Sequence, residues 1–210
     1  MGVISFFSLL FGLAVRPTRA ALPRSSAHVG IGAFNLVRRQ AYENVGGHQP
    51  VRLRPDDDLK LGKIIKKGGF RQMFAGARGM VEVHWYRTVG QMARGLEKNL
   101  FAGLEYSPVR AALCGIGFLW LFYGPFVGLL VARGLAQLLF AAAVASLLLL
   151  SVVSGRAATG ASRSASLALP LSATIFLYIF LRAVYLTYRR GGILWRDHFY
   201  PLSELRQNRI

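Results

Sequence analysis

The sequence is poor in cysteine and in acidic residues. Its single cysteine, Cys114, lies in an apolar run, so an intrachain disulfide is excluded and a packing role is the simplest interpretation. Only 9 of the 210 residues are Asp or Glu, against 26 Lys or Arg, which gives a formal net charge of +17. The four histidines show no H-x-x-x-H spacing, and the sequence has no P-loop. These absences exclude a histidine-based metal site and a Walker-type nucleotide site defined by local spacing.

The long second part of the chain contains very few charged residues. Residues 111–188 are rich in Leu, Ala, Val and Phe, whereas residues 1–110 hold 17 basic and 7 acidic residues. A soluble domain needs no apolar block of this length, so the sequence predicts a basic soluble or interfacial part followed by membrane spans. Three apolar segments, at about 111–132, 134–153 and 167–188, each approach the roughly 20 residues that a spanning helix needs.

The apolar segments raise a question of topology. Three complete crossings would place the basic N-terminal part and the basic tail, 189–210, on opposite sides, whereas the positive-inside rule favours the cytoplasm for both. One segment is therefore expected to be interfacial or re-entrant, and the first, which glycines and Pro125 interrupt, is the candidate; a tail on the outer side is the alternative. Residues 1–15 are apolar but short for a span, so we expect an interfacial or re-entrant segment there as well.

Short elements are predicted before the membrane part. Periodicity, glycine stops and acidic or basic ends indicate a buried strand at 33–37, a helix at 39–45, a helix at 56–67, a strand-like run at 70–86 and a helix from 88 to about 102.

Three adjacent carboxylates, Asp56, Asp57 and Asp58, stand at the start of the second of these helices. Their mutual repulsion raises at least one pKa, and such a cluster can hold a divalent cation or supply a general base for a hydroxyl nucleophile. The alternative is helix capping, since acids favour the positive end of a helix dipole.

Further candidate ligand contacts lie on the helix at 88–102 and in the tail. Gln91, Arg94 and Lys98 share one helix face, which suits phosphate binding or a surface turned to lipid headgroups. Trp195 and Arg196 suit a membrane interface or contact with a sugar or phosphate. His48 follows Gly46–Gly47 in a loop and is a weaker candidate for ligand contact, since a solvated loop histidine explains it too.

The order of these pieces resembles membrane-bound family 2 glycosyltransferases, in the branch of ceramide glucosyltransferases and bacterial hopanoid and carotenoid glycosyltransferases. The residues that carry the resemblance are GIGAFNLVRRQAYENVGGH, then DDDLKLGKIIKKGGF, then QMARGLEKN, then the apolar spans and a tail with WRDHFY. The resemblance is most specific over residues 28–110. It implies an α/β fold, a partial GT-A-type (nucleotide-diphospho-sugar transferase) domain at 16–110, followed by the α-helical membrane region at 111–188 and the tail.

The resemblance also implies roles for individual residues. Asp58 corresponds to the family's catalytic base, with Asp57 as its neighbour, and Gln91 and Arg94 correspond to a Q-x-x-R-W motif near the nucleotide pyrophosphate. Gly95 stands where that motif has Trp, and Asp197 follows Trp195 and Arg196 where relatives have Gly. The family's cofactor is a divalent cation, Mg²⁺ or Mn²⁺, but the D-x-D motif that binds it is absent, because residues 1–29 contain no acid.

These implications give a functional expectation. We expect a hexosyltransferase-type enzyme that transfers a sugar from a nucleotide-sugar donor to a lipid acceptor with inversion, as a fragment whose donor-binding half is encoded separately or lost. We also expect it in a bacterial-type inner membrane with its catalytic part cytoplasmic. The alternative is a non-enzymatic membrane protein whose basic part binds anionic lipid or a partner subunit. Nucleic acid is not an expected partner, because the basic residues lack interleaved aromatics and a known binding module.

Overall fold

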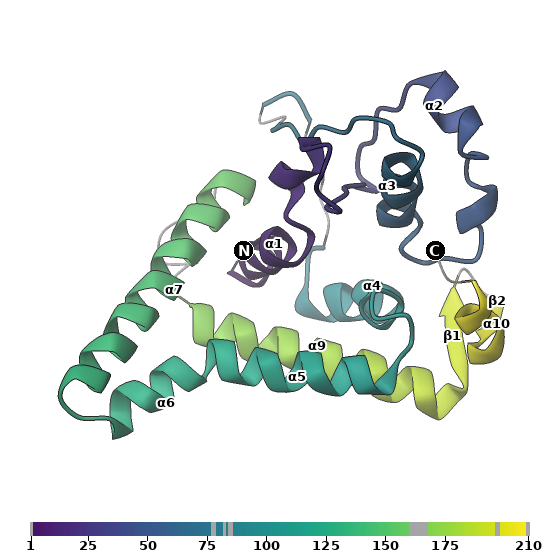
Figure 1. The fold of residues 1–210 in the computed structure, drawn as a ribbon. Coiled ribbons are helices and arrows are strands. Elements are labelled where there is room, and N and C mark those ends of the chain that lie inside the picture. Colours follow the sequence, from purple (N-terminus) through teal and green to yellow (C-terminus); the bar gives the residue numbers. More distant parts are fainter. Residues whose placement is uncertain are drawn as a thin grey trace. The chain divides into compact units, whose positions relative to one another are not determined.

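The computed structural model describes residues 2–76, 79–81, 83, 86–159, 168–195 and 198–208. The described chain is mostly helical, with one two-stranded sheet (Figure 1). It divides into two compact units. The apolar unit consists of Met1–Leu13 and Ser107–Val184, and the basic unit consists of Ala14–Tyr106 and Tyr185–Ile210. All nine acidic residues belong to the basic unit.

The apolar unit is built from helices and is held by aromatic contacts. It contains α1 (Gly2–Val15), α5 (Pro108–Phe122), α6 (Gly124–Val131), α7 (Leu135–Thr159) and most of α9 (Leu169–Arg190). Phe6 of α1 is buried, and its ring centroid lies 5.0 Å from that of Phe122 and 5.8 Å from that of Phe176. Edge-to-face pairs of this kind add to the apolar burial. Three helices that are far apart in the sequence therefore meet around one aromatic cluster.

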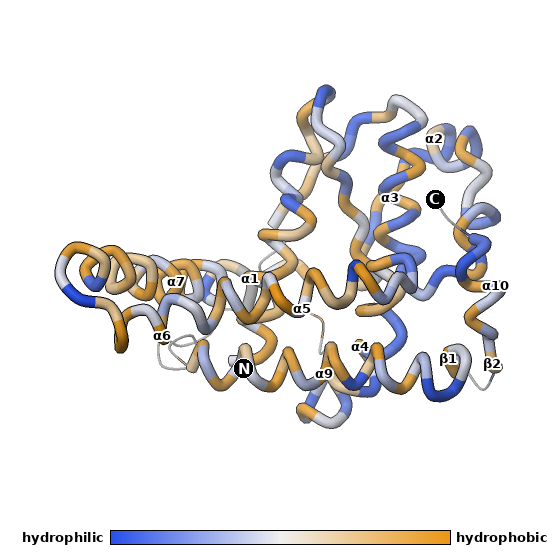
Figure 2. Tube along the Cα trace, turned by 60° about the horizontal axis from the view of Figure 1, so that its bottom comes forward, coloured by the Kyte–Doolittle hydropathy of each residue, from blue (hydrophilic) through white to orange (hydrophobic). Residues whose placement is uncertain are grey.

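Several of these helices are long and apolar enough to cross a membrane. The stretches Gly2–Ala21, Leu135–Ala157 and Leu169–Arg190 pass this test, and α5 with α6 forms a further pair bent by 43°. The bend coincides with Gly124–Pro125, because proline lacks the N–H that would continue the helix. Hydrophobic residues dominate the tubes of α6 and α7 (Figure 2). These helices are thus compatible with an integral membrane protein. The apolar stretch at the start of the chain extends beyond residue 15 through η1 (Pro17–Ala21).

The basic unit contains the helices predicted around the acidic cluster. They are α2 (Arg39–Asn44), α3 (Asp57–Lys67) and α4 (Val89–Ala102), together with η2 (Gln49–Val51). In α3 the apolar side chains of Leu61 and Ile65 are buried, while two acids occupy the first turn and two lysines the last. Such an arrangement suits both the helix dipole and a one-sided core. The glycine stops are confirmed too: Gly46, Gly47 and Gly69 have positive φ angles of 78°, 58° and 84°.

The tail folds back onto the same unit. After the last turn of α9, Gly191 adopts a φ of 67°, and β1 (Gly192–Trp195) pairs with β2 (His198–Pro201) in an antiparallel hairpin. The short helix α10 (Leu202–Gln207) follows and buries Leu205. The carbonyl of Gly191 accepts a hydrogen bond of 2.8 Å from the amide of Leu202, which closes the base of the hairpin.

The predicted strand at 33–37 is wrong, and the run at 70–86 forms no strand in its described residues. The described residues of both segments form turns or irregular structure, and the only sheet in the described part of the chain is the tail hairpin. A strand needs a neighbour to satisfy its backbone groups, and here the amide of Phe34 bonds back to the carbonyl of Ile31 in a turn. The side chains of Phe34 and Leu36 are 60% and 89% exposed, so the expected burial is also missing. Glu82, His84 and Trp85 of the second run lie outside the described residues.

The composition of the basic unit bears on the topology. Hydrogen bonds within it join the segment 14–106 to the tail, for example from Arg54 to the carbonyl of Asn208 at 3.0 Å and from Arg190 to Glu97 at 2.8 Å. If the apolar helices cross a membrane, both ends of the intervening stretch lie on the same side of it. An even number of complete crossings follows, so at least one of the three apolar segments after residue 110 does not cross, and the bent pair α5–α6 is the structural candidate.

We predict that Gln49→Cys and Gln207→Cys, each in a Cys114→Ser background, react with a membrane-impermeant maleimide from the same face of sealed vesicles. Both side chains are exposed on the basic unit, so labelling requires no unfolding. Arg133→Cys, between α6 and α7, then reports whether the bent pair crosses. Labelling of positions 49 and 207 from opposite faces would contradict the shared side.

Candidate functional site

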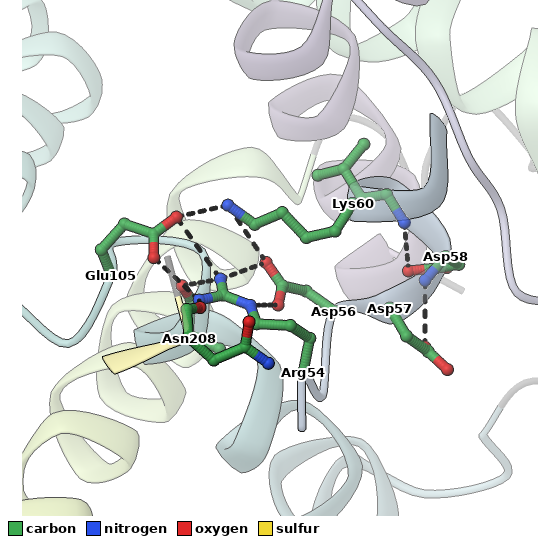
Figure 3. Close-up of polar contacts among 9 residues, drawn as sticks. Arg54, Asp56, Asp57, Asp58, Lys60, Glu105 and Asn208 are labelled. Carbon is green, nitrogen blue, oxygen red and sulfur yellow. Dashed lines mark hydrogen bonds and ion pairs between the residues drawn. The ribbon is translucent and has the colours of Figure 1, made fainter. Parts of the chain in front are cut away.

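The three clustered acids have different surroundings. Asp56 is buried, and its carboxylate receives two parallel hydrogen bonds from Arg54, 2.9 Å from Nε to Oδ1 and 3.0 Å from Nη2 to Oδ2. Its neighbours Asp57 and Asp58 lie away from this pair (Figure 3). A bidentate arginine occupies both carboxylate oxygens, so Asp56 is committed to the fold and is not available as a base or a cation ligand.

Arg54 is the centre of a buried group of four charges. Its guanidinium also donates to Glu105, 2.8 Å from Nη1 to Oε2, and to the carbonyl oxygens of Ala102 at 3.1 Å and Asn208 at 3.0 Å. Lys60, one turn into α3, pairs with the same Glu105. We call Arg54, Asp56, Lys60 and Glu105 the charge cluster; its two positive and two negative charges cancel.

Electrostatics within the cluster favour the charged forms. Burial alone would lower the pKa of Arg54, but its bonds and charge interactions with Asp56 and Glu105 raise it. Burial likewise acts to raise the pKa of Glu105, and the bonds from Lys60 and Arg54 outweigh it and lower that pKa. Arg54 and Glu105 thus favour their charged forms within the cluster, as paired and hydrogen-bonded charges do.

The loop that carries Glu105 is held in an uncommon backbone conformation. Glu105 and Tyr106 have φ angles of 55° and 52°, which side chains other than glycine rarely adopt. Tyr106 is fully buried, and its carbonyl accepts a hydrogen bond of 3.2 Å from Arg206 of α10. The charge cluster on one side and α10 on the other therefore fix this turn.

Asp58 is a half-buried carboxylate held by backbone amides. Its Oδ2 accepts a hydrogen bond of 2.6 Å from the amide of Gly32, and its Oδ1 accepts one of 2.7 Å from its neighbour Leu59. Burial raises the pKa of Asp58; the two backbone bonds oppose this, and the charges of Asp57 and Asp56 add to it. A carboxylate fixed in orientation and with a raised pKa has the properties of a general base.

Glycines permit the close approach that creates this site. A Cβ on Gly30 would lie 1.8 Å from the carbonyl oxygen of Asp58, and a Cβ on Gly62 would lie 2.0 Å from that of Val29. The backbone of 29–32 therefore lies directly on the first turns of α3. This contact brings residues 30–32 onto the acidic cluster, although Gly32 and Asp58 are 26 residues apart in the sequence.

Asp57 has the capping role that was the alternative for the whole cluster. Its Oδ1 accepts a hydrogen bond of 3.0 Å from the amide of Asp58, whereas Asp56, at the N-cap position, makes no side-chain cap bond. The three acids thus separate into a core ion-pair partner, a partner for a helix amide and a candidate base.

The residues predicted on α4 are only partly brought together. Gln91 supports the start of its own helix. Its side-chain Oε1 accepts a hydrogen bond of 3.0 Å from the backbone amide of Arg87, and its backbone amide donates one of 3.1 Å to Thr88 Oγ1. Arg94 is exposed on the same helix. Lys98 lies 4.8 Å from the ring centroid of Trp195, which joins α4 to β1. Arg196 lies outside the described residues.

His48 lies in a separate shallow pocket. Its Nδ1 is 2.6 Å from the hydroxyl of Tyr42, and Arg52 and Gly46–Gly47 also line the depression. All the described contacts of His48 are local to the segment 42–52, so nothing links this pocket to Asp58.

Sequence reasoning missed Arg54, Lys60 and Glu105. Arg54 and Lys60 counted only among the many basic residues of the sequence, although both are buried. One local sign of the pairing between Arg54 and Asp56 is that the two residues are separated in the sequence by Pro55 alone. Glu105 lies 51 residues from Arg54, so no local pattern could have paired them.

The described residues show no site that fits the divalent cation implied by the family resemblance. Among the described residues, no group of three or more His, Cys, Asp or Glu side chains is placed to hold a metal. Asp56 is paired with Arg54, and both oxygens of Asp58 accept backbone amides. The chain matches no protein family, no curated protein and no solved structure.

Proposed function

We propose that this chain is the acceptor-side part of a membrane-bound family 2 glycosyltransferase, with Asp58 as its catalytic base. The observation that carries the proposal is the environment of Asp58: a half-buried carboxylate, its pKa raised by burial, held by the amides of Gly32 and Leu59 beside an exposed loop. The ordered GIGAFN, DDD and Q-x-x-R motifs give the reaction class. A partial domain of the nucleotide-diphospho-sugar type and a cytoplasmic position in a bacterial-type inner membrane belong to the same proposal.

Asp58 would act at one step of an inverting transfer. Its carboxylate takes the proton of a lipid hydroxyl while that oxygen forms a bond to the anomeric carbon of the donor sugar. The bond from the anomeric carbon to the nucleotide diphosphate breaks on the opposite face, and the nucleotide diphosphate leaves. A raised pKa brings the base nearer to the operating pH, and the two amides hold it in one orientation, which reduces the cost of aligning it.

The remaining residues differ in what they would contribute. Arg94 is the exposed cation of α4 that suits the donor pyrophosphate. The side chain of Gln91 accepts a hydrogen bond from the backbone amide of Arg87 at the start of α4. A contact between Gln91 and the donor pyrophosphate would have to compete with this bond. Lys98 and Trp195, already in contact, would present a cation and an aromatic edge to the sugar or phosphate.

We expect Asp58→Asn to reduce sugar transfer to lipid by about 10²–10⁴-fold, the usual contribution of a general base. The assay uses membranes of the source organism, with labelled nucleotide-sugars and extracted lipid, and a gene deletion identifies the product. Asp57→Asn is the matched control, because it removes a neighbouring charge and leaves Asp58 in place; we expect a much smaller loss.

Two results would count against this function. Sugar transfer at the wild-type rate by the Asp58→Asn variant would show that Asp58 is not the catalytic base. An unchanged lipid glycosylation pattern after gene deletion would show that the protein is not the glycosyltransferase proposed. Salt-sensitive lipid binding that Asp58→Asn leaves unchanged would then favour the alternative, a basic membrane protein without catalysis.

A further inference from the structure

We propose that the tail hairpin β1–β2 is a membrane-surface element, whose Leu194–Phe199 pair inserts into the headgroup region of an anionic lipid leaflet. This proposal does not depend on the glycosyltransferase assignment. It starts from the register of the hairpin, in which Leu194 lies directly opposite Phe199. Side chains opposite each other on two paired strands share one face, and these two are 59% and 51% exposed. The hairpin therefore turns two large apolar side chains outward together.

The other face of the same hairpin is occupied by protein. Ile193 is buried, and Trp195 contacts both Lys98, at 4.8 Å, and Tyr200, at a centroid distance of 5.9 Å. Alternate residues of a strand point to opposite faces. The hairpin is thus two-sided, with one face packed on α4 and the Leu194–Phe199 face left for another surface.

Chain continuity indicates that this surface is the bilayer. Leu194 follows Arg190, the last residue of a candidate membrane span, by four residues, which reach at most about 14 Å when extended. The headgroup region is roughly 5–8 Å thick on each side of the hydrocarbon core, so even a fully extended chain keeps Leu194 within about 10 Å of that region. Because Gly191 turns the chain directly after the helix, the hairpin begins at the edge of the membrane and has no linker to carry it away.

The end of α9 carries the residues expected at such an edge. Tyr185 and Tyr188 are exposed near its last turn, followed by Arg189 and Arg190. Aromatic side chains favour the headgroup level, and basic side chains favour anionic lipid. Arg190 is paired with Glu97 at 2.8 Å, so the attraction to an anionic leaflet at this point comes from the exposed Arg189, beside which the apolar pair of the hairpin inserts.

Depth measurements on the full-length protein in proteoliposomes test the proposal. Leu194→Cys and Phe199→Cys, in a Cys114→Ser background, are labelled with a nitroxide and compared with Ser203→Cys on α10, which is also exposed. In vesicles containing phosphatidylglycerol we expect the two hairpin labels to be accessible to oxygen and protected from a water-soluble nickel chelate. The label at position 203 should show the reverse.

The other outcomes overturn the proposal. Nickel accessibility at 194 and 199 equal to that at 203 would show a hairpin in water. Protection from both reagents would show that a second copy or a protein partner covers the face. Hydrogen exchange of the unsubstituted protein is a second measurement: peptides of 192–201 should exchange several-fold more slowly in anionic nanodiscs than in zwitterionic ones, and equal rates would also contradict insertion.

Discussion

Replacing Arg54 by methionine is expected to destabilise the basic unit by about 3–5 kcal/mol, the cost of breaking a buried ion pair by removing one partner. The substitution leaves the buried Asp56 and the partly buried Glu105 with only Lys60 to balance them, and it removes the side-chain donor to the carbonyl oxygens of Ala102 and Asn208. Thermal unfolding of the detergent-solubilised protein, followed by tryptophan fluorescence, measures the effect.

Two companion variants separate burial from charge in this experiment. Arg39→Met removes an exposed ion pair with Glu43, which contributes about 0.5 kcal/mol or less, so its unfolding temperature should stay close to wild type. Adding Glu105→Gln to Arg54→Met restores a neutral cluster and should recover part of the loss. If Arg54→Met unfolded at the wild-type temperature, the charge cluster would contribute nothing to stability.

Gly62→Ala is expected to destabilise the same unit by about 1–3 kcal/mol, the usual cost of forcing extra volume into a packed site. Inside a helix, alanine is normally favoured over glycine by about 1 kcal/mol. Here the sign should reverse, because the new Cβ would lie 2.0 Å from the carbonyl oxygen of Val29, a backbone atom that cannot rotate away. Thermal unfolding gives the stability, and the pH dependence of sugar transfer reports on Asp58, because the displaced segment carries the amide of Gly32.

Gly12→Ala is the matched control for this prediction. It also lies in a helix, but a Cβ there would meet no atom within 4 Å. We expect Gly12→Ala to keep or slightly raise stability. A Gly62→Ala protein that behaved like Gly12→Ala would show that the segment 29–32 does not lie on α3 as described.

The helices of the basic unit could be predicted because their signals are local. Acids and lysines at opposite ends, buried Leu61 and Ile65, and glycine after the last turn are all contained within the α3 sequence. The strand at 33–37 failed for the opposite reason. Its apolar letters match a buried strand, but a strand is completed by hydrogen bonds to a distant segment, and no such neighbour exists in the described chain.

The candidate site shows the same division. The adjacency of Asp56, Asp57 and Asp58 was visible in the sequence, but their separate roles were not. Those roles depend on partners at long range: Gly32 for Asp58, and Glu105 and Asn208 around the Arg54 that holds Asp56. A bidentate arginine and a backbone amide give neighbouring carboxylates different chemistry, and one-dimensional spacing carries no information about either.

The hydrogen bond from Arg54 to Asn208 also constrains how the protein is made. The two residues are 154 positions apart, so at about 5–20 residues per second the ribosome delivers the acceptor roughly 8–30 s after the donor. The apolar helices α5, α6, α7 and α9 are synthesised in that interval. Arg54 can meet Asp56 and Glu105 as soon as residue 105 is made, but its bond to Asn208 must wait until these apolar helices have been synthesised. The surroundings of the charge cluster are therefore completed last.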